Sequence, residues 1–164
     1  MTENHYLVAL FEHHKWSNLT LIDFCADLSD EMLALTVPGT FGGVRQTLVH
    51  VIANEEHYLT FFPGSGITQT IHQRGDFQGF PALRAAAERT GEAFIRQART
   101  LANDARWQAE YEGETVTIDP TFPLIQAIHH GTEHRSHIRT ILSAHGFAPP
   151  EIDGWTYEEA LKGT

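Results

Sequence analysis

The sequence predicts an all-α protein, an up-and-down four-helix bundle, on three observations. Four long segments repeat apolar residues with the period of an α-helix. Clusters of Pro and Gly separate these segments, as at Pro38-Gly39 and Pro63-Gly64. The 164-residue chain is 41% hydrophobic and 20% charged, the composition of an ordinary globular protein. At this length we expect one domain, residues 1–164, with a core of its own.

The first two helices are expected over residues 4–28 and 43–62. Apolar side chains recur at helical spacing along the first of them, at Leu7, Leu10, Phe11, Leu21, Ile22, Cys25 and Leu28. Ser29 and Asp30 end this helix, and the Pro63-Gly64 pair stops the second. The single cysteine, Cys25, excludes an internal disulfide and is expected in the core.

The last two helices are expected over residues 81–103 and 124–145. Pro81 suits a first helical turn, and Gly146 closes the fourth helix. Between them, residues 107–118 alternate around Glu112-Gly113, which predicts a short hairpin or an extended segment before the last helix. A further short helix is expected after Trp155.

The net charge of the chain limits the classes of partner that it can bind. With 11 basic and 21 acidic side chains the net charge is -10, and no basic cluster of the kind that binds nucleic acid stands out. No apolar run approaches the ~18 residues of a membrane span. We therefore expect a cytoplasmic protein that binds neither nucleic acid nor membrane.

The most informative motif is a pair of histidines, His130 and His134. Their spacing places both imidazoles on one side of a helix, about one turn apart, where they can share a metal ion. Zinc proteases of this spacing need a Glu after the first His, but Gly131 stands there, so that chemistry is excluded. A third ligand must come from elsewhere, and His50 is the natural candidate. Because the chain has 11 histidines, an ordinary surface or core pair remains the alternative.

The faces of the predicted helices allow the three histidines to meet. At about 100° per residue, His134 falls in the apolar stripe of the last helix and His130 lies roughly 40° away. His50 lies on a second, mixed face of its helix, opposite the main apolar face. His137 falls about 20° beyond His130, and His57 follows His50 by about two turns. We expect both to line the pocket or to contact the metal ligands.

Three segments carry a family resemblance: HHKWSN at residues 13–18, TFGGVRQTLVHVIANEEHYL at 40–59 and HHGTEHRSHIRTIL at 129–142. In order and spacing they resemble the DinB/YfiT-like superfamily, over nearly the whole chain. The resemblance implies an up-and-down bundle that holds one divalent metal through three histidines. Carried over by position, these are His50, His130 and His134. Ser136 and His137 depart from the pattern, because the family usually has Gly and Gln there.

The resemblance also implies a function. Three neutral imidazoles leave coordination positions open, as in catalytic rather than structural sites. The expected activity is that of a metal-dependent enzyme acting on a small molecule, with thiol S-transferase-like or hydrolase-like chemistry. A low-molecular-weight thiol is one candidate substrate. The alternative is a non-catalytic, stress-associated metal-binding or scaffold bundle, and a homodimer is expected in either case.

The sequence leaves the metal and the catalytic residues open. Imidazole ligands favour Zn or Ni, with Fe, Mn or Cu as further candidates. No residue is identified as catalytic. Glu55, Glu56, Glu133 and His137 are candidates for acid–base work, whereas Trp16 and Asn18 are interpreted as packing and capping residues.

Overall fold

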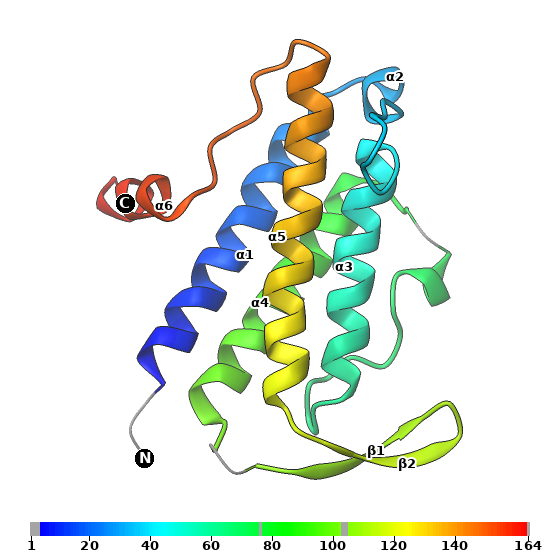
Figure 1. The fold of residues 1–164 in the computed structure, drawn as a ribbon, viewed down its shortest axis with the longest axis vertical. Coiled ribbons are helices and arrows are strands. Elements are labelled where there is room, and N and C mark those ends of the chain that lie inside the picture. The colour runs from blue at the N-terminus through cyan, green and yellow to red at the C-terminus, as the bar shows by residue number, and fades with distance from the viewer. Residues whose placement is uncertain (1–3, 76, 103–104, 164) are drawn as a thin grey trace.

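The computed structural model describes residues 4–75, 77–102 and 105–163 and is mainly helical (Figure 1). Four long helices form the bundle: α1 (His5–Ala26), α3 (Val44–Thr60), α4 (Phe80–Thr100) and α5 (Thr121–Ala144). Their first residues lie within three positions of the predicted ones. The predicted end of the third helix at residue 103 lies outside the described residues. The prediction of an all-α bundle is confirmed.

Short elements join and extend the bundle. They are α2 (Asp30–Leu33), the 3-10 helix η1 (His72–Arg74), strands β1 (Trp107–Tyr111) and β2 (Glu114–Ile118), and α6 (Gly154–Lys162). The strands pair antiparallel around Glu112-Gly113, whose φ angles of 51° and 83° suit a tight hairpin turn, so the hairpin prediction is confirmed. Helix α2 was not predicted. Helix α1 ends at Ala26, three residues before Ser29, and the Ser29 hydroxyl instead accepts from the Met32 amide and thereby begins α2.

The four long helices run in two directions. Figure 1 shows α1 and α5 ascending from the lower end of the molecule, while α3 and α4 both descend. Because α3 and α4 are parallel, the chain between them must return along the whole length of the bundle. This crossover connection, described for residues 61–75 and 77–79, contains η1 and covers one side of α3.

The core consists of two apolar clusters at opposite ends of the bundle. The lower cluster joins the starts of α1 and α5 to the ends of α3 and α4, with Phe11, Phe62, Phe94, Leu124 and Ala127 among its members. The upper cluster joins the opposite ends, with Leu21, Leu48, Leu83, Ile138 and Leu142 among its members. Cys25 lies in the upper cluster, where burial raises its thiol pKa to about 12, so the core assignment is confirmed. No helix among the described residues is long and apolar enough to span a membrane.

A buried polar layer separates these two clusters. It consists of His14 and Asn18 from α1, Glu55 from α3, Thr90 from α4 and Arg135 from α5, each at most 5% exposed. Glu55 accepts hydrogen bonds from Asn18 (2.7 Å) and Thr90 (2.6 Å), and its Oε1 lies 2.7 Å from His14 Nε2. Arg135 Nη1 donates to Asn18 Oδ1 at 2.7 Å and lies 3.3 Å from His14 Nδ1. All four bundle helices therefore meet at one set of hydrogen bonds.

The charges in this layer follow from its hydrogen bonds. A guanidinium can only donate, so His14 Nδ1 accepts from Arg135 and the proton of His14 lies on Nε2, facing Glu55. Burial lowers the His14 pKa, which keeps the ring neutral. Burial alone would raise the pKa of Glu55, but His14 and the hydrogen bonds from Thr90 and Asn18 lower it. Burial lowers the pKa of Arg135 to about 10, so Arg135 remains the cation that balances Glu55 at neutral pH.

The C-terminal segment lies against α1. The Ile152 carbonyl accepts from Ser17 Oγ at 3.3 Å and lies 2.9 Å from His13 Nε2. The ring of Tyr157 in α6 packs on Trp16, with centroids 5.2 Å apart. Trp16 is thus a packing residue, as interpreted, whereas Asn18 serves the buried polar layer rather than a helix cap.

Replacing Arg135 by Met should destabilise the protein by about 3–5 kcal/mol, because it leaves the buried Glu55 carboxylate without its charge partner. Urea denaturation of the two proteins at pH 7 measures the difference. Arg96→Met, at an exposed position of α4, is the control and should change little. A loss below about 1 kcal/mol, the range of an exposed pair, would contradict this account of the layer.

Candidate metal centre

The three predicted histidines converge. His50 from α3 and His130 and His134 from α5 each offer a ring nitrogen, and these nitrogens all lie within 4.8 Å of one another. His50 Nε2 and His130 Nε2 are 3.0 Å apart. Two nitrogens bound to one ion at 2.0–2.1 Å are separated by about 2.9–3.4 Å for bond angles between octahedral and tetrahedral. The His50–His130 pair therefore has the spacing of two ligands of one ion, and His134 completes a group within 4.8 Å.

Helix geometry and one amide hold the triad in place. On α5 the four-residue spacing stacks His130 over His134, with ring centroids 4.4 Å apart. On α3, Asn54 follows His50 by one turn, donates to its carbonyl at 2.8 Å and lies 3.2 Å from its Nδ1. The ring of Phe41 stacks on His50 at 3.9 Å and meets His134 edge-on at 5.0 Å. Phe41 thus covers part of the triad.

The environment keeps the three imidazoles neutral. Burial lowers the pKa of His130 to about 4, assisted by the nearby His134 and His50. Burial also lowers the pKa of His50, with His134 and His72 adding to the effect, and that of His134, with His137 adding to it. Neutral imidazole is the form that binds metal, so the triad is poised for an ion at neutral pH.

The polar atoms around the triad fit a metal ligand set. The Nδ1 atoms of His130, His134 and His137 are buried and, within the part of the chain that the structure describes, have no hydrogen-bond partner. A buried ring nitrogen without a partner is costly, and an ion supplies one to a ring that faces it through Nδ1, whereas His130 faces His50 through Nε2. Three imidazole nitrogens are ligands that suit Zn, Ni, Fe and Cu.

The two further histidines lie in different places. The half-buried His137 is next to the triad, with its ring centroid 5.3 Å from that of His134. His57 is exposed on α3, and its ring packs on Phe61 with centroids 5.3 Å apart. The structure therefore brings His137 to the triad and leaves His57 about two turns away from His50.

A comparison with protein families tests the family resemblance of the three motifs. A model described as the DinB family matches residues 1–162. The chain belongs to the DinB family. The resemblance inferred from its three motifs is thereby confirmed. No curated protein and no solved structure matched, so the chemistry of this DinB-family chain has to be argued from its own residues.

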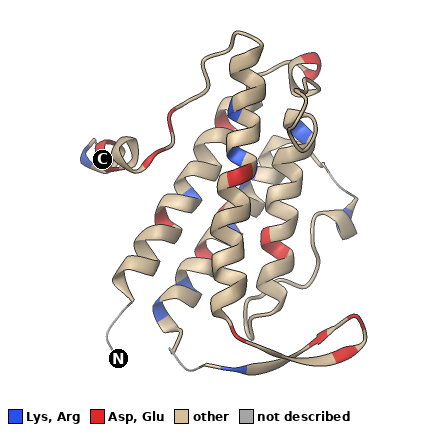
Figure 2. Ribbon diagram, in the orientation of Figure 1, with Lys and Arg blue, Asp and Glu red and all other residues tan. Residues whose placement is uncertain are grey.

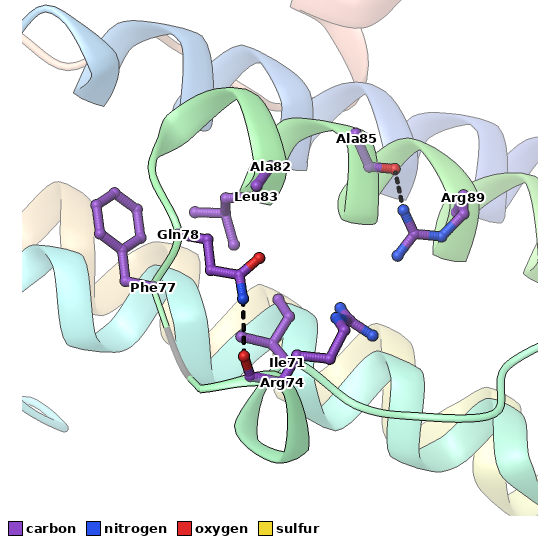
Figure 3. Close-up of a pocket in the computed structure, with 8 residues that line it drawn as sticks. All are labelled: Ile71, Arg74, Phe77, Gln78, Ala82, Leu83, Ala85 and Arg89. Atoms are coloured by element: carbon purple, nitrogen blue, oxygen red, sulfur yellow. Dashed lines mark hydrogen bonds between the residues drawn. The ribbon is translucent and has the colours of Figure 1, made fainter.

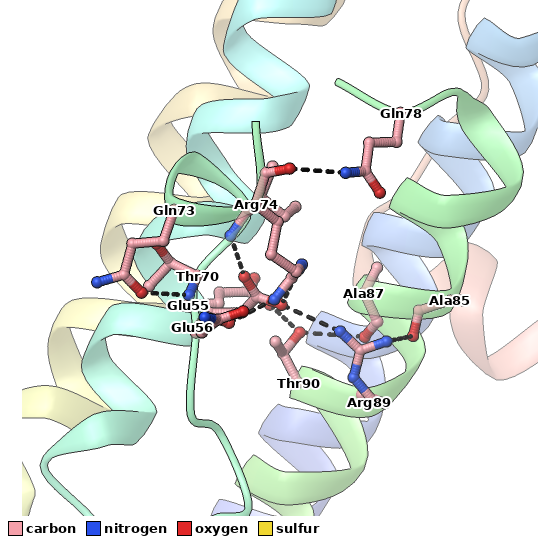
Figure 4. A network of polar contacts seen from close by, with 12 residues as sticks. Glu55, Glu56, Thr70, Gln73, Arg74, Gln78, Ala85, Ala87, Arg89 and Thr90 are labelled. Carbon is pink, nitrogen blue, oxygen red and sulfur yellow. Dashed lines mark hydrogen bonds and ion pairs between the residues drawn. The ribbon is translucent and has the colours of Figure 1, made fainter. Parts of the chain in front are cut away.

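Two of the expected acid–base residues serve the fold instead. Glu55 belongs to the buried polar layer. Glu56, also fully buried, accepts from the Ile71 amide at 2.6 Å, from Arg74 at 2.8 Å and from Arg89 at 3.1 Å. Figure 4 shows how this carboxylate ties the crossover connection to α3 and α4. The interpretation of Glu55 and Glu56 as acid–base groups is therefore wrong, because these contacts occupy both carboxylates.

The remaining acidic candidate is nearer to the triad. Glu133 is exposed on α5, and its charge opposes the lowering of the His134 pKa. It occupies the turn of α5 that carries the triad, beside His134. Because this carboxylate is exposed, solvent and salt screen its charge. Its influence on a ligand at the triad is therefore electrostatic and weak.

Two cavities lie on either side of Phe77. The smaller, about 190 Å³, is formed by the crossover connection and α4 (Figure 3). There Gln78 donates to the Arg74 carbonyl at 2.7 Å and Arg89 to the Ala85 carbonyl at 3.3 Å. The larger, about 630 Å³ and open to solvent, includes His50 in its wall and thus borders the triad.

Sequence reasoning places Asn54 on the mixed face of His50 without giving it a role, and it misses Phe41. Asn54 lies four residues after His50 on the same face, so its contact could have been found from helical spacing. Phe41 belongs to the loop before α3, where no periodicity indicates a direction. Its place over His50 depends on tertiary packing.

Acidification should release metal only well below neutral pH. The ordinary histidine pKa is 6.5, and the ligands have lowered values, so protons begin to compete with the ion below that pH. We expect the affinity for Zn²⁺ to be nearly constant from pH 8 to 7, to fall once the pH is below 6.5, and to keep falling to about pH 4, where His130 takes up its proton. Competition titration against a chromophoric chelator measures this. A tenfold loss between pH 8 and 7 would show that other groups bind the ion.

Proposed function

We propose that this DinB-family protein is a metal-dependent enzyme acting on a small molecule, with His50, His130 and His134 holding one divalent ion. The convergence of three neutral imidazoles beside an open pocket carries the proposal. Three protein nitrogens leave at least one coordination position for water or substrate, which is the arrangement of catalytic zinc sites. Zn or Ni fits the nitrogen ligands best, and Fe, Mn and Cu are further candidates.

The chemistry we propose is thiol S-transferase-like or hydrolase-like. A divalent ion at the triad would lower the pKa of a bound water or thiol, or polarise a carbonyl. A low-molecular-weight thiol is therefore a candidate substrate. The residues of the chain would position the substrate, exclude water from the site and transfer protons. His137 is the best placed of them for proton transfer, since its ring lies beside His134.

The alternative function is a non-catalytic, stress-associated metal-binding or scaffold bundle. In that case the ion would be structural, and the fold would depend on it. Against this, the buried polar layer already joins the four bundle helices without using any triad residue. The two functions thus predict different behaviour of the metal-free protein.

Replacing His50 by Ala should remove the metal and preserve the fold. Elemental analysis should find about one ion per chain in the original protein and almost none in the variant, since losing a residue that only orients a ligand already costs about 10–100-fold in affinity and losing a ligand costs more. Circular dichroism and thermal unfolding should remain close to those of the metal-free original protein. His129→Ala, at the exposed neighbour of His130, is the matched control and should retain the ion.

The outcomes of this experiment separate the two functions. Retention of metal by His50→Ala would exclude the triad as the site. Unfolding of the metal-free protein, with or without the substitution, would favour a structural ion and the scaffold function.

From the composition of the chain, we propose that the protein is cytoplasmic and that it does not bind nucleic acid. Figure 2 shows the Lys and Arg residues spread over several helices of the described chain rather than gathered along one. Such a distribution lacks the positive stripe that neutralises phosphates.

We also propose a homodimer. Large apolar side chains are exposed at the starts of α1 and α5, where Tyr6 is 83% and Phe122 68% exposed. Between these helices a groove of about 530 Å³ is lined by Leu10 and Ile125, which are about half exposed. Apolar surface of this kind commonly marks a protein–protein contact.

Light scattering should therefore give twice the 18.4 kDa mass of the chain. Leu10→Glu should shift the protein to the monomer, because it places a charge in the apolar contact. Glu12→Gln, on the same helix, is the control. A monomer at high concentration of the original protein would contradict the proposal.

A further inference from the structure

We infer that the open pocket beside the triad binds a small carboxylate with an apolar body, and that Arg45 recognises the charge of this ligand. The inference rests on the proposed function, because it names the substrate class of the same site. Three observations support it: the position of the pocket, the residues that form its wall, and the contacts of the Arg45 guanidinium.

The pocket is adjacent to the face of the triad. His50 is part of its wall, and so is Phe41, whose ring contacts both His50 and His134. A molecule in this space of about 630 Å³ therefore lies next to one of the three ligands, His50. The volume suits a small organic molecule.

Most of the wall is apolar. Leu33, Val49, Phe41 and Phe77 supply it, from α2, α3 and the two flanking connections. An apolar lining favours a ligand with a hydrocarbon or aromatic portion, since such a portion gains about 25 cal/mol per Å² buried. The ligand class is thus not a simple inorganic ion.

The charged part of the wall is basic. Arg45 supplies a permanent positive charge to the lining, and no Asp or Glu is among the described residues that form it. The chain as a whole has 21 acidic and 11 basic side chains, so this wall has the opposite sign to the molecule. The positive charge of Arg45 in this wall favours an anionic ligand and disfavours a cationic one.

Arg45 is held in place by contacts that a ligand can exchange. Its guanidinium lies 5.2 Å from the centroid of the Phe77 ring, and its Nη2 donates to Asp30. Its Nε is buried and has no hydrogen-bond partner among the described residues. The side chain of Asp30 is 87% exposed, so this ion pair is weak and can be shared with or replaced by a ligand carboxylate. Arginine suits this role because its planar fork binds carboxylates through two hydrogen bonds.

The spacing along α3 sets the shape of the ligand. Arg45 precedes His50 by five residues, which is about 7.5 Å along the helix axis. A ligand that pairs with Arg45 and presents a reacting group at the triad therefore needs a spacer of several carbon atoms. This requirement agrees with the apolar wall between the two.

The far wall of the pocket is fixed rather than loose. His72 and Phe77 belong to the crossover connection, which Glu56 holds through the Ile71 amide and Arg74 (Figure 4). The pocket is thus preformed, and a ligand does not have to order this segment on binding.

The test compares 4-phenylbutyrate with its neutral amide by isothermal titration calorimetry, on metal-loaded and chelator-treated protein. We expect the acid to bind about tenfold or more tightly than the amide, the effect of one charge-assisted contact. The preference should persist without metal. Arg45→Gln should abolish it and Arg45→Lys should retain part of it, while binding of the amide stays the same.

The test also includes a matched control and a variant that is expected to tighten acid binding instead of weakening it. Arg139 resembles Arg45 in pairing with a carboxylate, Glu151, and in its buried, unpartnered Nε among the described residues, but it does not line the pocket. Arg139→Gln should therefore leave the preference unchanged. Asp30→Asn should tighten acid binding by about two- to fivefold, because it removes the competitor of the ligand. A gain of this kind cannot arise from misfolding.

Several results would overturn the inference. These are equal binding of acid and amide by the original protein, an unchanged preference in Arg45→Gln, and weaker acid binding in Asp30→Asn. Loss of the preference on removal of metal would assign the carboxylate to the ion instead of Arg45. The proposed function is tested separately by the metal content, so a metal-binding protein without acid preference would refute this inference alone.

Discussion

The ionised carboxylate of Glu55, buried at the centre of the bundle, is the constraint on which the rest of the structure depends. A buried charge is costly unless it is paired and fully hydrogen-bonded. Its partners come from the three other helices: Asn18 and His14 from α1, Thr90 from α4, and Arg135 from α5 through the first two. The hydrophobic effect is non-directional, whereas these hydrogen bonds depend on distance and angle. The polar layer therefore fixes how the helices are aligned along the bundle axis.

The same alignment creates the histidine triad. Arg135 directly follows His134, and Glu55 directly follows Asn54, which holds His50. When the polar layer forms, α3 and α5 are consequently in the register that brings the three imidazoles together. Gly131 is essential to this register, because a Cβ there would lie 2.5 Å from His14 Cε1 and 2.9 Å from Arg135 Nη1. The residue whose presence excludes zinc-protease chemistry thus serves the packing of the polar layer behind the triad.

Helical periodicity explains how much could be predicted from the sequence. It located the four long helices and the triad, since His130 and His134 lie on one helix and His50 stands out on a mixed face. It could not identify Glu55 as buried, because its partners lie 35 to 41 residues away on two other helices, so no local pattern reveals them. Helical spacing predicted both His57 and His137 near the pocket, yet His57 is exposed. Which turn of α3 faces α5 is decided by the polar layer and not by α3 itself.

Two adjacent glutamates give α3 its central place in the site. Neighbouring positions on a helix point about 100° apart, so Glu55 faces the bundle interior while Glu56 faces the crossover connection. Through Glu55, α3 is aligned with the helix that carries His130 and His134. Through Glu56, it is aligned with the segment that carries His72 and Phe77 and closes the pocket. Because His50 and Arg45 also belong to α3, the metal ligands and the pocket wall are positioned relative to a single helix. A rigid common reference of this kind is what a site needs to hold an ion and a substrate at a fixed separation.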